Sequence, residues 1–267
     1  MFPNLLSFIL LLAPQGTPAP KPSPALAGIA HVALRVTEVR TSREFYGRLG
    51  FQEAFAFSDP GKPPVSYLKV NDRQFIELYQ RNDDSQPLGL MHICYEAGNI
   101  DALHEYYVNR GVNTPAARKA RAGNLLFVLR DPEDHVVEFT QYMPGSLHYQ
   151  ARGKYLGEGR VSSQMGGASI PVKDIEAERS FYTSKLGFED TDEKGALRLP
   201  GNSGEAVELQ SGPPARILFE VADLERSARD LASRGFQVRK SDRSISIADP
   251  DGAILEFIPA NKTANQR

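Results

Sequence analysis

Cysteine and tryptophan are almost absent from this chain. Among its 267 residues there is one cysteine, Cys94, and there is no tryptophan. A single cysteine excludes an intramolecular disulfide and leaves no set of thiolates for a zinc cluster. A metal site in this chain would therefore have to be built from imidazole and carboxylate groups.

The sequence also lacks a large excess of charge and a long apolar segment. Its formal net charge is −2 and it has no basic run, so nucleic acid is not an expected partner. The apolar run at residues 5–13 (LLSFILLLA) is too short to be a stable membrane span. With 41% hydrophobic and 24% charged residues, the composition is that of an ordinary soluble globular protein, long enough for two domains.

The first residues differ from the rest of the chain. The apolar run at residues 5–13 has the length of the hydrophobic region of a signal peptide. The proline-rich stretch that follows predicts an extended linker, so residues 1–27 are interpreted as a signal segment with a linker. We expect an exported, periplasmic or secreted protein; the alternative is a cytoplasmic protein with a disordered tail.

Two strand-like stretches carry side chains that can bind a metal. The alternation in GIAHVALRV, residues 28–36, places His31 and Arg35 on the face opposite Val32 and Leu34. In FIELY, residues 75–79, a single face carries Phe75, Glu77 and Tyr79.

The same pattern recurs further along the chain. LMHICYE, residues 90–96, places His92, Cys94 and Glu96 on one face, and HVVEFTQ carries Glu138. His31 and Glu77 are 46 residues apart (31 to 77), and so are His92 and Glu138 (92 to 138). The sequence thus presents two histidines and two glutamates on four predicted strands, in two copies of one unit.

Each unit follows a strand–helix–strand–strand–strand order, and the order is repeated four times. Residues 168–188 match residues 32–51, and DPDGAILEF at 249–257 matches DPEDHVVEF at 131–139. We therefore predict an α+β fold of four βαβββ units in two tandem domains. The predicted boundaries are 28–142 for the first domain, 143–161 for a linker, 162–260 for the second domain and 261–267 for a tail.

Four such units, with FY…LGF after the first strand of each pair and a D-P-x-[G/D]-x-x-x-E-F ending, resemble the vicinal oxygen chelate superfamily. This group includes glyoxalase I, extradiol dioxygenases and bleomycin-binding proteins. The resemblance implies curved, half-open barrels and a metal held by His31, Glu77, His92 and Glu138. It also implies that pairing of the first unit with the second, within one chain or across a homodimer, gathers all four ligands.

The second pair of units departs from this pattern. Its equivalent positions are Gly167, Glu208, Arg216 and Glu256. Glycine offers no ligand atom and arginine repels a cation, so we expect no metal there.

In the first pair, burying two carboxylates together without a cation would cost several kcal/mol. A divalent ion removes that cost. Two imidazoles and two carboxylates suit Zn, Ni, Co, Mn or Fe(II).

We expect the substrate pocket to include Arg35, Phe75, Tyr79, Cys94 and Glu96. Arg35 could hold a substrate carboxylate or pair with Glu96, and both alternatives stay open. His148 lies in the predicted linker, outside the ligand pattern, so we expect no functional role for it.

The resemblance favours a glyoxalase I-like enzyme that abstracts a proton from a small substrate chelated through neighbouring oxygens. The base would be Glu138 first and Glu77 second. Export, and Arg81 at a position where the family pattern has a glutathione-contacting asparagine, argue against a glutathione-linked substrate. One alternative is an Fe(II) extradiol-type dioxygenase that uses His31, His92 and Glu138.

The dioxygenase signature lacks its tyrosine, because Val128 stands at that position. A further alternative is a non-catalytic small-molecule-binding protein of the bleomycin-resistance type.

Overall fold

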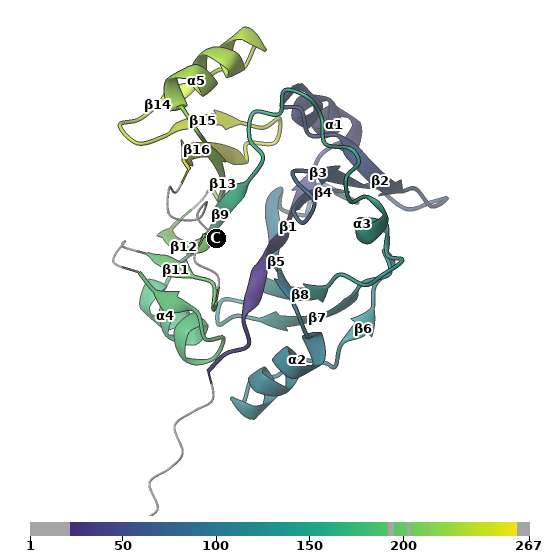
Figure 1. Cartoon of the computed structure of the whole chain (residues 1–267), viewed down its shortest axis with the longest axis vertical. Helices are drawn as coiled ribbons and strands as arrows, with labels where there is room; N and C mark the ends of the chain where they lie inside the picture. Colours follow the sequence, from purple (N-terminus) through teal and green to yellow (C-terminus); the bar gives the residue numbers. More distant parts are fainter. Residues whose placement is uncertain (1–21, 192–194, 202–203, 213, 261–267) are drawn as a thin grey trace, which may run out of the picture.

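The structure, a computed structural model, describes residues 22–191, 195–201, 204–212 and 214–260. Two sheets of eight strands each lie side by side, with short helices at their margins (Figure 1). The predicted α+β class with two tandem copies of one architecture is confirmed. The predicted signal segment, residues 1 to about 20, lies outside the described residues, so export stays a prediction. Within the described ranges no helix is long and apolar enough to cross a membrane.

The first sheet contains the two units that carry the candidate ligands. Its strands are β1 (Leu26–Val36), β2 (Glu53–Phe57), β3 (Val65–Lys69), β4 (Phe75–Gln80), β5 (Gly89–Ala97), β6 (Arg118–Lys119), β7 (Leu125–Arg130) and β8 (Val136–Gln141). They are ordered β2-β3-β4-β1-β5-β8-β7-β6, and the sheet curls into a half-open barrel (Figure 1). The antiparallel pair β1–β5 joins the first unit to the second within one chain.

The second sheet repeats this order in the second half of the chain. Its strands are β9 (Met165–Val172), β10 (Glu189–Asp190), β11 (Ala196–Arg198), β12 (Ala206–Ser211), β13 (Arg216–Val221), β14 (Arg239–Lys240), β15 (Ile245–Ala248) and β16 (Ile254–Pro259). The order β10-β11-β12-β9-β13-β16-β15-β14 is that of the first sheet, strand for strand. The sequence repeat is therefore a structural repeat.

One helix accompanies each unit, and a further short helix follows β8. The helices are α1 (Val39–Arg48), α2 (Ile100–Asn109), α3 (Leu147–Gln150), α4 (Ile175–Ser184) and α5 (Leu224–Ser233). Side-chain oxygens of Asn99, Asp174 and Asp223 accept backbone N–H bonds at the starts of α2, α4 and α5. Helix α3 lies within the predicted linker, so this segment has local structure of its own.

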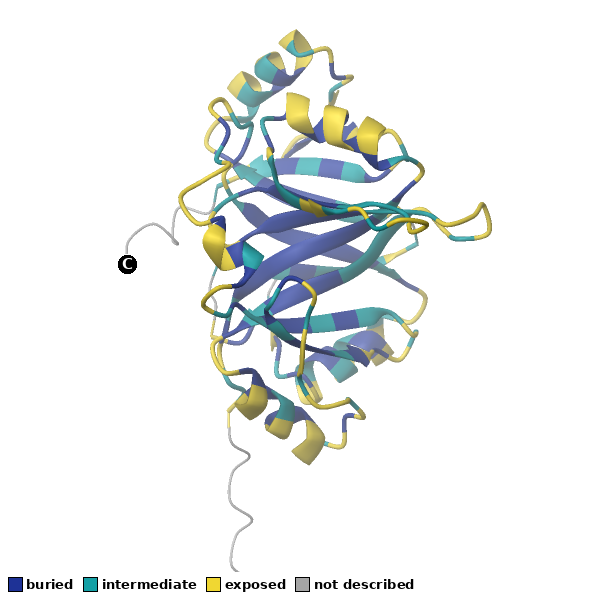
Figure 2. Ribbon diagram, turned by 90° about the vertical axis from the view of Figure 1, so that its right-hand side faces the viewer, coloured by how far each residue is buried: buried dark blue, intermediate teal, exposed yellow. Residues whose placement is uncertain are grey.

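The two sheets pack against each other through the apolar faces of their central strands. Val32 and Leu34 of β1 belong to the same hydrophobic cluster as Ala168 of β9 and Phe219 of β13. In Figure 2 the central strands are buried, whereas the helices expose their outer faces to solvent. Because alternate residues of a strand point to opposite faces, His31 and its neighbours are left on the concave side of the first sheet.

Two Asp-Pro turns connect the domains in a symmetric way. Asp131 accepts the backbone N–H groups of Glu133 and His135, so its side chain stabilises the turn before β8. Its counterpart Asp249 closes the equivalent turn and also accepts a hydrogen bond from the Tyr46 hydroxyl of the other domain, 3.1 Å away. These buried polar contacts fix the mutual orientation of the sheets.

Candidate metal centre

Four adjacent strands in the middle of the first sheet carry the candidate ligands. In the order β4-β1-β5-β8 these are Glu77, His31, His92 and Glu138. Cys94 lies opposite His31 across the β1–β5 pair and beside Glu138 across the β5–β8 pair. The strand register therefore brings residues that are far apart in sequence to one place on the concave face.

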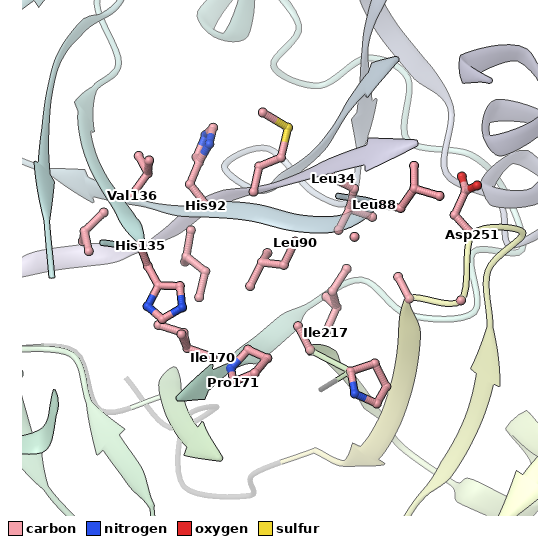
Figure 3. A pocket seen from close by; sticks show the side chains of 18 of the residues that line it. Leu34, Leu88, Leu90, His92, His135, Val136, Ile170, Pro171, Ile217 and Asp251 are labelled. Atoms are coloured by element: carbon pink, nitrogen blue, oxygen red, sulfur yellow. The ribbon is translucent and has the colours of Figure 1, made fainter. Parts of the chain in front are cut away.

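A bulge in β5 turns Leu90 and His92 to opposite faces of the strand. Ala33 pairs with His92, but the next residue, Leu34, pairs with Leu90, so Met91 is an extra residue in β5. Without the bulge, Leu90 and His92 would share a face. In Figure 3 the two side chains instead lie on opposite sides of the strand, with the imidazole directed away from the second domain.

The four side chains converge. The Nε2 atoms of His31 and His92 are 3.1 Å apart. Glu138 Oε1 lies 3.5 Å from His31 Nε2, and its Oε2 lies 4.0 Å from His92 Nε2. Glu77 instead lies near the other ring nitrogen of His31, with Oε1 3.3 Å from His31 Nδ1. His31 Nε2, His92 and Glu138 thus face one point, and Glu77 lies on the opposite edge of the His31 ring.

Glu77 is the more firmly held of the two carboxylates. The Tyr79 hydroxyl donates a hydrogen bond of 2.8 Å to Glu77 Oε2, and the Glu77 side chain is 5% exposed. Glu138 is 13% exposed and interacts with the Cys94 thiol. Of the two, Glu138 is therefore the carboxylate with more freedom to move.

Burial favours the uncharged form of all four candidate ligands. Desolvation, followed by the nearby His92, lowers the pKa of His31, and desolvation lowers the pKa of His92 to about 4. Desolvation and then the Glu138 charge raise the pKa of Glu77, while desolvation raises the pKa of Glu138 to about 7. The imidazoles are neutral at pH 7, the form in which histidine binds metals.

These residues fit a divalent cation. Two ligands at ~2.1 Å from one ion, with an angle near 90–110°, would be roughly 3.0–3.4 Å apart, close to the shorter separations found here. Donor atoms of His31, Glu77 and His92 lie within 4.8 Å of one another, and so do those of His31, Cys94 and Glu138. A bound cation would stabilise the charged form of both carboxyl groups. It would therefore lower their pKa values, which is opposite to the effect of desolvation. Glu77 would serve as a fourth ligand or would orient His31 through Nδ1.

The cavity in front of these side chains has a volume of about 230 Å³. Besides His31, Glu77, Tyr79 and Glu138, it is lined by Tyr67, Arg118, Ala120, Arg121, Ala122, Asn124, Leu126, Thr140 and His148. Desolvation raises the pKa of the Tyr67 hydroxyl, so this side chain stays protonated. Tyr67 and Asn124 were not predicted from the sequence, and His148 was expected to have no functional role. Alternation within β3 would have indicated Tyr67, but no periodic pattern includes His148.

The predicted pocket residues divide into two groups. Phe75, Tyr79 and Cys94 lie at or directly behind the cavity, as part of its wall or its hydrophobic backing. The alternative that Arg35 pairs with Glu96 is wrong, because the guanidinium of Arg73 lies 2.8 Å from Glu96 Oε2. Arg35 instead donates a hydrogen bond of 3.1 Å to the Pro87 carbonyl at the end of β1. It is therefore at the margin, free of any carboxylate contact within the described chain.

The equivalent place in the second domain contains an arginine. Arg216 lies 2.6 Å from Glu208 Oε2 and 2.9 Å from Glu256 Oε2 through two different guanidinium nitrogens. The register confirms the equivalence, since Cys94 pairs with Glu138 and Leu218 pairs with Glu256. A Cβ atom at Gly167 would lie 2.4 Å from the Ala206 carbonyl oxygen, so a ligand side chain there requires a backbone shift. The side chain of Arg216 therefore lies between the two carboxylates and supplies the positive charge that a metal would supply in the first domain.

A second cavity, of about 310 Å³, lies between the two domains. Figure 3 shows that Leu34, Leu90, Ile170 and Ile217 line it, and that its few polar side chains include His92, His135 and Asp251. Its wall is mostly apolar and lacks the converging donors of the first cavity. We therefore assign the candidate site to the smaller cavity on the concave face.

A separate group of donors, Asp131, His135 and Glu178, bridges the two domains. His135 Nδ1 lies 2.8 Å from Asp131 Oδ2, and this hydrogen bond raises the pKa of His135. Glu178 Oε1 accepts the N–H of Glu133 at 2.9 Å, and desolvation raises the pKa of Glu178 to about 7. The ion pair between His135 and Asp131 accounts for the proximity of these side chains, so we assign no metal to this group.

Comparison with known proteins agrees with this architecture. Residues 28–139 match the family model described as the Glyoxalase/Bleomycin resistance protein/Dioxygenase superfamily. No curated protein sequence gives a significant match. Many solved structures are similar, and three of the most similar illustrate the range.

The first is a Mn(II)-bound glyoxalase from Novosphingobium aromaticivorans, with a TM-score of 0.68 and 17% identity over 88% of this chain and 82% of that chain. The second is the 2,3-dioxygenase LapB from Pseudomonas sp. KL28, with a TM-score of 0.67 and 15% identity over 89% and 93% of the two chains. The third is an extradiol ring-cleaving dioxygenase from B. fuscum, with a TM-score of 0.67 and 18% identity over 90% and 73%. At these identities the likeness establishes the fold, and the expected resemblance is confirmed.

Proposed function

We propose that this chain, whose first domain belongs to the Glyoxalase/Bleomycin resistance protein/Dioxygenase superfamily, is a metal-dependent enzyme acting on a small molecule with two neighbouring oxygens. The observation that supports this proposal is the convergence of two imidazoles and two carboxylates on the concave face of the first domain, beside a cavity that is lined by His31, Glu77 and Glu138. A purely passive binding protein needs the cavity but not this donor set.

The reaction that we propose is proton abstraction of the glyoxalase type. A divalent ion bound by His31, His92 and the carboxylates would chelate the substrate oxygens and lower the pKa of the C–H bond beside the carbonyl. Glu138 is the first candidate for the base, because it borders the cavity and is held less firmly than Glu77. The proton leaves the substrate carbon for a Glu138 oxygen and is returned from there to the neighbouring position.

Two features of the chain would support this reaction. Tyr79 holds Glu77 in one orientation through its hydroxyl, so the position of the second carboxyl group is fixed. The walls formed by Phe75, Tyr67 and Leu126 limit the water around the reacting atoms, which strengthens electrostatic interactions inside the cavity.

The alternative is a ring-cleaving dioxygenase, and one observation favours it. His31 and His92 present their Nε2 atoms to Glu138, whereas Glu77 approaches the Nδ1 edge of His31. Two histidines and one carboxylate are the ligand set of many non-haem Fe(II) enzymes. In that case Glu77 would not bind the metal but would orient His31. Val128, which pairs with Glu138 across β7–β8, still supplies no acid or base at the position of the extradiol tyrosine.

One pair of assays separates the two reactions. The Mn(II)-loaded and Fe(II)-loaded protein is incubated in D₂O with α-hydroxyketones and with thiol adducts of 2-oxoaldehydes, and in an oxygen electrode with a panel of catechols. Deuterium at the substrate carbon without oxygen uptake is the expected result. Oxygen consumption coupled stoichiometrically to catechol turnover would refute proton abstraction and establish the alternative. Tight binding of these compounds without either reaction would instead indicate a binding protein.

A further inference from the structure

Two arginines and two glutamates are the charged residues that line the cavity on the concave face. One of the arginines, Arg121, already has partners. Its guanidinium lies 2.7 Å from Asp59 Oδ1, and its Cζ atom lies 3.9 Å from the centre of the Phe57 ring. Arg121 lies between β6 and β7, and Asp59 lies between β2 and β3. Because β2 and β6 are the two edge strands of the sheet, this ion pair joins the edges and accounts for the charge of Arg121.

The other arginine, Arg118, has no such partner. It is exposed, and its guanidinium forms no hydrogen bond or ion pair with any residue in the described ranges. A charged side chain on an edge strand is often a solvated group that protects the edge from pairing with another chain. For Arg118, the register of the sheet and the charges around the cavity indicate a further role.

The strand register places Arg118 on the concave face. Arg118 pairs with Leu126 of β7, and Leu126 pairs with Thr140 of β8. Residues directly opposite each other share a face of the sheet, and all three of these line the cavity. Glu138 lies two residues before Thr140 and therefore on the same face of β8. The Cα atoms of Arg118 and Glu138 are then two strand spacings and one pleat apart, roughly 12 Å in a flat sheet and less in a curved one.

The charge of Arg118 reaches the candidate metal ligand Glu138. Desolvation raises the pKa of Glu138 to about 7, and the hydrogen bond with Cys94 and then the charge of Arg118 oppose that rise. With a divalent ion bound, the carboxylates of Glu77 and Glu138 would balance the two positive charges of the ion. The charge of Arg118 would then have no counterpart among the residues that line the cavity. Such a surplus of positive charge favours a ligand with a negative group on the side of β6.

We propose that Arg118 is a specificity-determining residue that binds a carboxylate of the substrate, while the two neighbouring oxygens of the substrate face the metal site. This inference rests on the proposed function in one respect, that the cavity is the substrate site. A guanidinium can donate two parallel hydrogen bonds to one carboxylate. The cavity volume of about 230 Å³ is below the ~300–1,000 Å³ of sites for drug-sized ligands. The substrate is therefore a compact acid, with its carboxylate a few bonds from the chelating oxygens.

The first test compares two small chelators that differ by one charge. Succinic acid monohydroxamate and its amide analogue present the same pair of chelating oxygens, but the acid carries a carboxylate where the analogue carries a neutral amide. Their binding to the Co(II)-loaded protein is followed by the visible spectrum. The wild type should bind the acid roughly 10- to 100-fold more tightly than the amide, as expected for hydrogen bonds to a charged group. Equal affinities would overturn the proposal.

The two residues of β6 supply a matched pair of variants. Arg118→Gln removes the charge beside the cavity, whereas Lys119→Gln removes an equal charge from the other face, where its pairing partner Leu125 packs against the hydrophobic core. The preference for the acid should disappear in Arg118→Gln and persist in Lys119→Gln. Arg118→Lys should recover part of it, because lysine keeps the charge but loses the two-pronged geometry. A preference that survives in Arg118→Gln, or that is lost equally in Lys119→Gln, would refute a specific contact.

Metal content separates this inference from the proposed function. Each variant should bind as much Co(II) as the wild type. If the wild type binds Co(II) and both chelators without a preference, Arg118 does not determine specificity, and the metal site is unaffected. If the wild type binds no Co(II), the proposed function fails, and NMR of the metal-free protein decides on Arg118. Its Nε–H resonance, assigned by its absence from Arg118→Gln, should then shift with the acid and not with the amide; no shift with the acid would overturn the anion site.

Discussion

Metal uptake by the first domain should depend on pH through a carboxyl group. Burial raises the pKa of Glu138 to about 7 in the metal-free protein, and a ligand carboxylate must lose its proton before the metal binds. The deprotonated fraction of a group with a pKa of ~7 rises from about one-tenth at pH 6 to about nine-tenths at pH 8. The apparent affinity for Mn(II) should therefore increase by at least ~10-fold over this range.

The histidines contribute little to this dependence, because the pKa of His92 is lowered to about 4 and that of His31 is lowered as well. The raised pKa of Glu77 would make the dependence steeper if Glu77 is a ligand. Calorimetric titration in buffers of different ionisation enthalpy measures the protons released: about half a proton from Glu138 at pH 7 and about nine-tenths at pH 6.

Glu138→Gln removes the titrating group, and Glu256→Gln at the equivalent strand position of the second domain is the control. The variant at 138 should bind Mn(II) more weakly and with a flatter pH profile, whereas the control should behave like the wild type. Affinity that does not change between pH 6 and pH 8 in the wild type would show that the Glu138 carboxyl does not control metal binding. An unchanged pH profile in Glu138→Gln would do the same.

Three further predictions follow from individual contacts. Glu138→Gln should lower turnover by ~10²-fold or more, as expected for the loss of a general base. Glu77→Gln should lower turnover by less. The opposite order would assign the base to Glu77. Arg216→Met leaves two carboxylates facing each other and should lower the free energy of unfolding by about 1–3 kcal/mol in urea titrations; an unchanged midpoint would show that the arginine only fills space. Desolvation raises the pKa of Glu178 in the folded protein from its ordinary value of 4.5 to about 7, so this group costs stability as pH rises from about 4.5 to 7. Glu178→Gln should therefore stabilise the protein on the order of 1 kcal/mol more at pH 8 than at pH 5, and an equal effect at both would count against a buried acid.

Much of the architecture follows from local patterns in the sequence. Alternation identified the faces of β1 and β4, and the equal spacing of 46 residues between His31 and Glu77 and between His92 and Glu138 indicated two copies of one unit. Once equivalent strands pair in register, equivalent residues must meet. The structure brings the four side chains together in this way, within one chain.

The remaining features depend on contacts that no local pattern encodes. The bulge at Met91 breaks the alternation of β5 and lets Leu90 face the second domain while His92 points toward His31. His148 comes from a segment without sustained periodicity, and its burial depends on an aromatic cluster assembled from β2, β3, β4 and the end of β8. Arg73, in the turn before β4, binds Glu96 because the fold brings the two residues together, and no local pattern favours Arg73 over Arg35 as the partner.

The central claim is that the first domain holds one divalent ion and the second domain holds none. Titration of the chelator-treated protein with Mn(II) or Co(II), followed by elemental analysis, tests it most directly. We predict one equivalent per chain, strongly weakened binding in His31→Ala and His92→Ala, and unchanged stoichiometry in Arg216→Met. Two equivalents in the wild type, or none after reconstitution, would contradict the account.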